Sequence, residues 1–167
     1  MSDSSQKRVA LFPASFDPPT NGHLDLIDRS LQVFDEVVVA VANNVKKSGT
    51  FEVDERLEML HGMLADHDRV RVEAFDGLVV QHAQAIGACA IIRGLRMMSD
   101  FEYEFEMALM NRHLAPDVEI IFLASSQEYL YVSSSRLKEL VRFGAAVDEF
   151  VPPIVAEYLH KKIAGRL

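Results

Sequence analysis

Short apolar runs alternate with longer amphipathic segments along this chain, and few folds accommodate that order. The apolar runs are nearly continuous and rich in β-branched residues, which is typical of strands buried on both faces. They lie at residues 9–12, 37–42, 70–74, 89–92 and 120–124. Apolar residues recur at helical spacing in 24–34, 57–64 and 101–114, and the serines at 133–135 and prolines at 152–153 are typical of helix starts.

This alternation predicts an α/β protein: a single-domain, Rossmann-like, doubly wound parallel five-stranded sheet with helices on both faces. The 167 residues suit one domain, which we expect to span residues 8–167 after a flexible polar N-terminus at residues 1–7. The N-terminus has no apolar core typical of a signal peptide, and no segment is long enough to span a membrane. We therefore expect a cytoplasmic protein without a membrane partner.

Composition excludes some functions. The 25 acidic residues outnumber the 17 Lys and Arg residues and give a net charge of −8, so we expect no nucleic-acid partner. The histidines lack the spacing of metal ligands, and we expect no protein-held metal. Cys89, the only cysteine, lies in an apolar run and is predicted to be a buried, unreactive thiol. The methionines at 97, 98, 107 and 110 are interpreted as core or subunit packing.

The loop after the first predicted strand, residues 12–23, combines hydroxyl side chains, a tight turn and His23 at the start of a helix. Free backbone N–H groups and the positive end of the helix dipole meet there, which favours binding of an anion. His23 lies in the first helical turn, close enough to contact a bound phosphate. The loop indicates phosphoryl or nucleotidyl transfer.

Other polar residues also follow predicted strands. Lys47 follows the second strand, Arg93 and Arg96 the fourth, and the segment 125–135 the fifth. In an open parallel sheet the carboxyl ends of the strands lie along one rim, where ligands bind. We therefore predict a positive pocket for a polyphosphate, with His23 and Arg93 on the same side of the molecule.

Two short motifs narrow the chemistry. The chain has neither a P-loop nor a Gly-x-Gly-x-x-Gly fingerprint. Residues 20–23 (Thr-Asn-Gly-His) match the T/H-x-G-H signature of nucleotidyltransferases, and residues 133–138 match their serine-rich second signature. Further segments resemble the phosphopantetheine adenylyltransferases, a bacterial family of coenzyme A synthesis: Lys47 before 51–56, and residues 92–96, 100–104, 110–113 and 132–135. The resemblance covers nearly the whole chain.

The resemblance implies that residues 8–167 are a nucleotidyltransferase domain. It would transfer the adenylyl group of ATP to 4′-phosphopantetheine by in-line attack at the α-phosphorus, giving 3′-dephospho-coenzyme A and pyrophosphate. The resemblance also implies Mg²⁺ with ATP, coenzyme A as a further ligand, and a homohexamer. His23 would be catalytic, and Ser15, Lys47, Val79 and Arg93 would bind the acceptor. The ATP site would comprise Ser15, Phe16, His23, Gly94, Leu95, Arg96, Glu104, Tyr129, Leu130, Tyr131, Val132, Ser133, Ser134 and Ser135.

Two departures from the family pattern leave alternatives open. Ala14 stands where the family usually has glycine, and Val45 where it has proline. If position 14 requires a positive φ, backbone strain or weaker nucleotide binding would follow. One alternative is a related nucleotidyltransferase with a different acceptor. Another is a catalytically silent protein that binds a nucleotide or coenzyme A.

Overall fold

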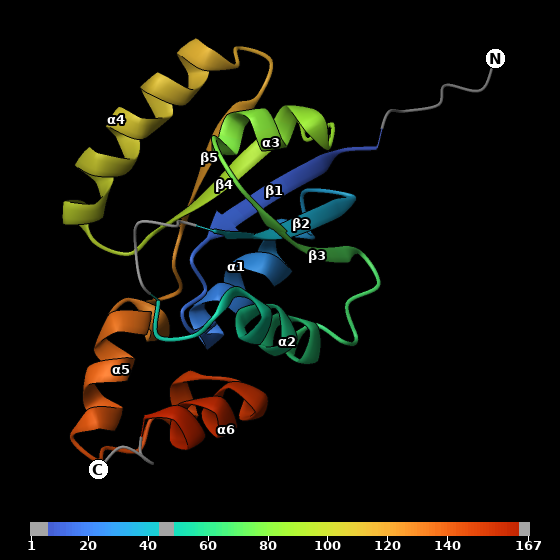
Figure 1. The fold of residues 1–167 in the computed structure, drawn as a ribbon. Helices are drawn as coiled ribbons and strands as arrows, with labels where there is room; N and C mark the ends of the chain where they lie inside the picture. Colours follow the sequence, from blue (N-terminus) through green and yellow to red (C-terminus); the bar gives the residue numbers. More distant parts are fainter. Residues whose placement is uncertain (1–6, 44–48, 164–167) are drawn as a thin grey trace.

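The predicted parallel sheet is present (Figure 1). A computed structural model describes residues 7–43 and 49–163. The sheet contains five strands in the order β3-β2-β1-β4-β5, and all neighbouring pairs are parallel. The strands are β1 (Val9–Ala14), β2 (Glu36–Ala42), β3 (Val70–Phe75), β4 (Ala90–Leu95) and β5 (Glu119–Ala124). Each overlaps one of the predicted apolar runs, so the α/β fold class is confirmed.

Helices cover both faces of the sheet. Figure 1 shows α3 and α4 on one face and α1 and α2 on the other. The helices are α1 (Asn21–Ser30), α2 (Val53–Met63), α3 (Val79–Ala85), α4 (Met98–Leu114), α5 (Ser134–Arg142) and α6 (Pro153–Lys162), with short 3₁₀ turns at Gln127–Tyr129 and Asp148–Phe150. The predicted starts of α5 and α6 are confirmed, since Ser133 is the N-cap of α5 and Pro153 is the first residue of α6. Helix α3 was not expected.

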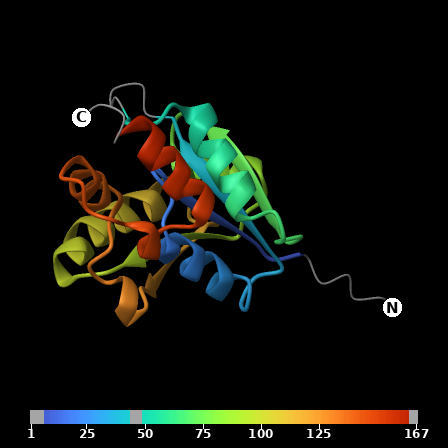
Figure 2. The same ribbon diagram turned by 90° about the horizontal axis from the view of Figure 1, so that it is seen from below.

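Three apolar clusters hold these layers together. Because side chains alternate along β1, Ala10 and Phe12 face one way and Leu11 the other. The α1–α2 cluster includes Ala10, Phe12, Leu26, Ile27, Val39, Leu60 and Ile92. The α3 cluster includes Leu11, Val38, Ala40, Val80, Ala83 and Ile91. The C-terminal cluster joins α2, α5 and α6 through Phe51, Met59, Val132, Leu137, Val155 and Leu159, and Figure 2 shows α6 alongside α2.

Burial differs from the expectation in three places. The edge strands β3 and β5 are only partly buried, whereas β1 and β2 are buried on both faces and β4 is buried over its first three residues. Helix α4 has no buried residue, although its large side chains are mostly apolar. Its three methionines, at 98, 107 and 110, and its N-cap Met97 are therefore outside the core, and their packing between subunits stays a prediction. The predicted burial of Cys89 is wrong: the residue precedes β4 at the amino end of the sheet and is exposed, with its thiol donating to the Val9 carbonyl at 3.3 Å.

Within residues 7–43 and 49–163, no helix has both the length and the apolar character that crossing a membrane requires.

Candidate active site

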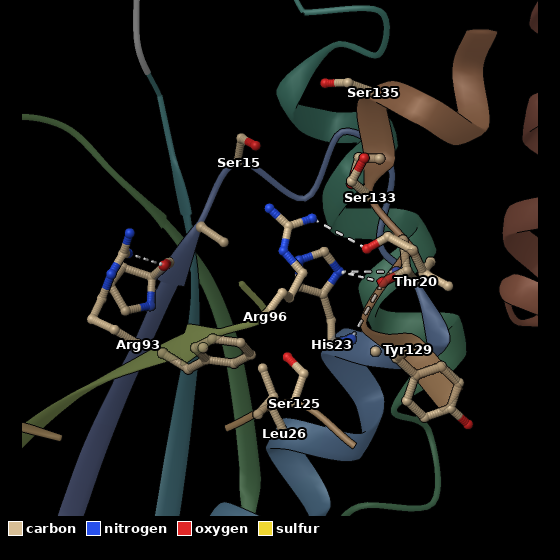
Figure 3. Close-up of a pocket in the computed structure, with 17 residues that line it drawn as sticks. Ser15, Thr20, His23, Leu26, Arg93, Arg96, Ser125, Tyr129, Ser133 and Ser135 are labelled. Atoms are coloured by element: carbon tan, nitrogen blue, oxygen red, sulfur yellow. Dashed lines mark hydrogen bonds between the residues drawn. The ribbon is translucent and has the colours of Figure 1, made fainter. Parts of the chain in front are cut away.

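A pocket lies at the carboxyl ends of β1 and β4 (Figure 3). These neighbouring strands flank the point where the strand order reverses, which is where open parallel sheets bind ligands. The pocket has a volume of about 280 Å³. It is lined by Phe12, Pro13, Ala14, Ser15, Thr20, Gly22, His23, Leu26, Arg93, Gly94, Arg96, Ser125, Tyr129, Val132, Ser133, Ser134 and Ser135. His23 and Arg93 thus share one pocket, as predicted.

His23 is held by the start of its own helix. Thr20 is the N-cap of α1, and its side-chain oxygen accepts a hydrogen bond from the His23 backbone N–H at 3.3 Å. In return, the Thr20 backbone N–H donates to His23 Nδ1 at 3.0 Å. This reciprocal cap satisfies two donors at the helix terminus and fixes the imidazole at the pocket wall.

Burial determines the charge of the His23 ring, and the hydrogen bond at Nδ1 determines which nitrogen carries the proton. Burial, and then the positive charge of Arg96, lower the pKa of His23 to about 4, so the ring is neutral at pH 7. A backbone N–H can only donate, and Nδ1 must therefore be the unprotonated nitrogen. The ring proton is then on Nε2, which makes His23 a neutral hydrogen-bond donor, poorly suited to act as a general acid.

Phe16 packs against the imidazole of His23. Its ring centroid lies 5.0 Å from that of His23, and the side chain is fully buried. Phe16 has φ 46°, and no other non-glycine residue in the described segments has a positive φ. A bulky residue in this region is strained, and such strain is common at functional sites. Ala14 does not have a positive φ, so the condition under which strain would arise at that position is not met.

Two helix N-termini face the pocket. Thr20, Gly22 and His23 begin α1, and the serines at 133–135 begin α5. Ser133 Oγ accepts the Arg136 N–H at 3.2 Å, and Ser134 Oγ donates to the Pro18 carbonyl at 2.7 Å. The two helix dipoles and their unpaired N–H groups favour an anion between them.

Arginines complete the positive lining. Arg96 lies next to His23 in Figure 3, and its Nη1 donates to the Val132 carbonyl at 3.2 Å. Arg93 lies on the opposite side of the pocket, where its Nη1 donates to the Pro13 carbonyl at 2.9 Å. Both guanidinium groups are held by hydrogen bonds before any ligand arrives, which reduces the conformational entropy lost on binding.

A buried ionic cluster behind the pocket was missed by the sequence interpretation. The Asp17 carboxylate accepts hydrogen bonds from Lys138 Nζ at 2.6 Å and from the backbone N–H groups of Thr50 at 3.0 Å and Phe51 at 2.9 Å. Arg56 donates to the Phe51 and Ser15 carbonyls at 2.7 and 3.3 Å. The cluster thus joins the β1–α1 loop, the segment before α2, and α5.

The charge of Asp17 is stabilised in this cluster. Burial by itself would raise the pKa of Asp17, but the hydrogen bonds from Lys138 and the two backbone N–H groups outweigh it and lower the pKa below its ordinary value. One signal for this cluster is present in the sequence, because Lys138 lies in the segment that matches the second nucleotidyltransferase signature. Its partner is 121 residues away, and only the fold identifies it.

Only some of the predicted site residues line the pocket. Ser15, His23, Arg93, Gly94, Arg96, Tyr129, Val132 and the serines at 133–135 line it. The lining does not include Phe16, Leu95, Glu104, Leu130 and Tyr131, and Val79 is the first residue of α3. Lys47 and Val45 lie outside the described residues. Gly22 and Ser125 belong to segments that the sequence placed at the pocket, whereas Leu26 lines it without having been expected.

Gly94 has a packing role. A Cβ built on it would lie 2.5 Å from Leu26 Cδ1, well inside van der Waals contact. The absence of a side chain therefore lets α1 pack closely against β4 beneath the pocket.

The chain is similar in sequence to known proteins. Residues 11–140 match the family described as cytidylyltransferase-like. The chain is 50% identical over 158 residues to phosphopantetheine adenylyltransferase from Geobacter sulfurreducens, covering 95% of this chain and 96% of that protein. It is 52% identical over 155 residues to the enzyme of the same name from Caldanaerobacter subterraneus, covering 93% and 97% of the two chains.

A solved structure shares the fold. The putative nicotinate-nucleotide adenylyltransferase from Vibrio parahaemolyticus superimposes with a TM-score of 0.64 at 18% identity, covering 92% of this chain and 99% of that one. This similarity supports the fold and carries no argument about the acceptor.

Proposed function

The chain belongs to the phosphopantetheine adenylyltransferase family, and we propose that it transfers the adenylyl group of ATP to 4′-phosphopantetheine. The products are 3′-dephospho-coenzyme A and pyrophosphate. The observation that most supports this function is the composition of the pocket at the ends of β1 and β4. It combines a neutral histidine donor, two arginines and two helix N-termini.

The reaction requires no covalent enzyme intermediate. The terminal phosphate of 4′-phosphopantetheine is already a nucleophile, so it can attack the α-phosphorus of ATP in line while pyrophosphate leaves. The main obstacles are the repulsion between two polyanions and the charge on the oxygens of the transition state. Fixed hydrogen-bond donors and positioning address both.

The residues divide between the two substrates. We propose that His23 Nε2–H, Arg96 and the N-termini of α1 and α5 bind ATP phosphates, with Ser15 between the substrates. Arg93, on the other side of the pocket, would hold the acceptor phosphate together with Lys47, and Val79 would contact the pantetheine arm. This division is supported by the positions of His23, Arg96 and Arg93 in Figure 3.

Mg²⁺ would enter this site with ATP. The lining residues include no carboxylate, and the described segments contain no group of three or more His, Cys, Asp and Glu side chains that could hold a metal. Hydroxyl groups of Ser15 and of the serines at 133–135 are present instead. This donor set fits a Mg²⁺ ion that keeps water and phosphate ligands, and the bound ion would neutralise phosphate charge.

We further propose that the protein assembles as a homo-oligomer, with the hexamer implied by the family resemblance. The exposed apolar side chains of α4 support association, because burying them against another copy of the chain would remove apolar surface from water. The cytoplasmic location expected from the sequence stays a prediction.

A coupled assay tests the proposed function. The purified chain is incubated with ATP, Mg²⁺ and 4′-phosphopantetheine, pyrophosphate release is followed, and the product is identified by mass. Nicotinate mononucleotide serves as a comparison acceptor. Pyrophosphate release with only the comparison acceptor would overturn the proposed substrate. Binding of ATP without pyrophosphate release would indicate a silent binding protein.

A further inference from the structure

Helix α1 holds the chain at the point where it leaves β5. Oδ2 of Asp25 accepts hydrogen bonds from Oγ of Ser126 at 2.8 Å and from Nη1 of Arg29 at 3.2 Å. The same Nη1 of Arg29 donates to the carbonyl of Ala124, the last residue of β5, at 2.7 Å. The helix therefore binds both the end of the strand and the second residue beyond it.

The segment held in this way forms part of the pocket wall, because Ser125 and Tyr129 both line the pocket (Figure 3). The Ser125 backbone N–H donates to the Leu95 carbonyl at 2.8 Å and so continues the pairing of β5 with β4. Ser126 is the N-cap of the next 3₁₀ turn, and its carbonyl accepts the Tyr129 N–H at 2.9 Å. The side chain of Ser126 therefore fixes the start of the turn that carries Tyr129.

Tyr129 also packs directly on α1. A Cβ built on Gly22 would lie 3.3 Å from Cβ of Tyr129, so the tyrosine lies against the first turn of the helix. Gly22, Asp25 and Arg29 are spaced by three and four residues and therefore share one face of α1. That single face contacts the strand end, the turn and the tyrosine.

The far end of the same wall is held by other groups. The Val132 carbonyl accepts a hydrogen bond from Nη1 of Arg96 at 3.2 Å, and Ser133 is the N-cap of α5. The bond between Ser126 and Asp25 supplies a side-chain anchor at the beginning of the wall. A wall that is fixed at both ends loses less conformational entropy when a ligand binds to it.

The ion pair between Asp25 and Arg29 serves this anchor better than it serves the helix. The two side chains are 19% and 36% exposed, and a pair four residues apart at such a surface adds little to helix stability. Their bonds to Ser126 and Ala124, in contrast, join parts of the chain that are 101 and 95 residues apart.

We propose that Asp25 is a positioning residue for the nucleotide. It orients Ser126, and through Ser126 the turn that carries Tyr129, before ATP binds. This inference rests on the proposed function, since it takes the wall formed by Ser125 and Tyr129 as part of the ATP site. The effect of Asp25 on ATP then passes through the wall, and binding of the acceptor does not depend on it.

The substitution Ser126→Ala tests this role by removing one hydroxyl group. We expect the dissociation constant of ATP with Mg²⁺, measured by calorimetry without acceptor, to rise roughly 3- to 10-fold, because the wall must then be ordered on binding. The dissociation constant of 4′-phosphopantetheine and the melting temperature should change little. Ser126→Thr keeps the hydroxyl and should bind ATP as tightly as the parent.

Asp25→Ala removes the acceptor and should weaken ATP binding at least as much. Combining it with Ser126→Ala should cause almost no further loss, because both substitutions remove the same hydrogen bond. Asp28→Ala is the matched control on the same helix. Oδ1 of Asp28 lies 2.8 Å from Nε2 of His67, and neither residue lines the pocket. This control should leave the affinity for ATP unchanged.

Three results would overturn the inference. Unchanged affinity for ATP in both Ser126→Ala and Asp25→Ala would show that their contact does not position the wall. A parallel loss of affinity for 4′-phosphopantetheine would indicate a general disturbance of the fold. Equal losses in Asp25→Ala and Asp28→Ala would assign the effect to the helix as a whole. The unsubstituted protein is assayed in parallel, and its failure to bind ATP or to release pyrophosphate would overturn the proposed function instead.

Discussion

At the scale of single residues, the neutral His23 is the feature with the clearest chemical meaning. Its Nδ1 accepts a backbone hydrogen bond, and its pKa is lowered to about 4, so it offers an Nε2–H donor over the whole neutral range. A fixed neutral donor stabilises phosphate charge without requiring proton transfer. This suits a reaction in which the nucleophile is already ionised.

Removal of this donor should slow the reaction and leave the fold intact. We expect His23→Ala to reduce turnover by about 10²–10³, the usual cost of losing one donor from a preorganised site. His61→Ala is the control, because His61 is exposed on α2. Pyrophosphate release and thermal unfolding are measured on both variants. Comparable turnover in His23→Ala and the parent would contradict the catalytic role.

The titration of His23 should also be displaced to acid pH. NMR should show the His23 ring unprotonated down to about pH 5 in the ligand-free protein, because its pKa is about 4 instead of 6.5. Because the unfolded chain binds this proton more readily, His23 should also destabilise the fold as the pH falls from 6.5 toward 4. A midpoint near 6.5 for His23 would contradict the neutral-donor assignment.

At the scale of secondary-structure elements, the Asp17 cluster connects the parts that form the pocket. Asp17→Asn should leave Lys138 and Arg56 buried without their counter-charge and lower the free energy of unfolding by roughly 3 kcal/mol. Asp66→Asn, at an exposed turn, should change it by less than about 0.5 kcal/mol. Urea unfolding measures both.

The pH dependence of this effect has a definite sign. The folded-state pKa of Asp17 is lowered, so its contribution to stability is present above the unfolded value of 3.8 and is lost as the pH falls below it. The stability difference between the parent and Asp17→Asn should therefore shrink in acid. An equal difference at pH 7 and pH 3 would show that charge is not the cause.

The elements differ in how well the sequence predicts them. The strands were predictable because short, continuous runs of β-branched residues seldom form any other secondary structure. The starts of α1 and α5 were predictable from their capping residues. Helix α3 has only seven residues, too few to establish a helical period. The exposure of α4 was not predictable, because apolar residues lie on all sides of it and periodicity identifies no buried face.

The site was predictable to the extent that it depends on strand ends. His23 and Ser133–Ser135 lie at helix starts, Arg96 follows β4, and Arg93 lies in the carboxyl half of β4. Parallel topology brings such positions together. The partners of these residues depend on exact packing. Asp17 meets residues 33 and 121 positions away, and no local pattern encodes those distances. The strained backbone at Phe16 likewise follows from how the loop closes on the imidazole.

At the scale of the whole molecule, the exposed face of α4 should be covered by further copies of the chain. The double substitution of Leu109 and Met110 to Glu should therefore yield smaller particles in sedimentation experiments, because charges in an apolar interface are costly. Phe143→Glu is the control, since Phe143 is 81% exposed but lies at the end of α5. Its particle size should match that of the parent. A monomeric parent protein would contradict the assembly.

The pocket lies between two apolar clusters that have no residue in common. Phe12 and Leu26 belong to the α1–α2 cluster, whereas Val132 belongs to the C-terminal cluster. A nucleotide bound between them would contact both clusters. Binding of substrate would therefore stabilise the packing of one cluster against the other. Backbone amides of α5 and α6 should then exchange hydrogen more slowly once ATP is bound, while those of β2 change little. Depletion of substrate would leave the carboxyl-terminal third the first part exposed to proteolysis.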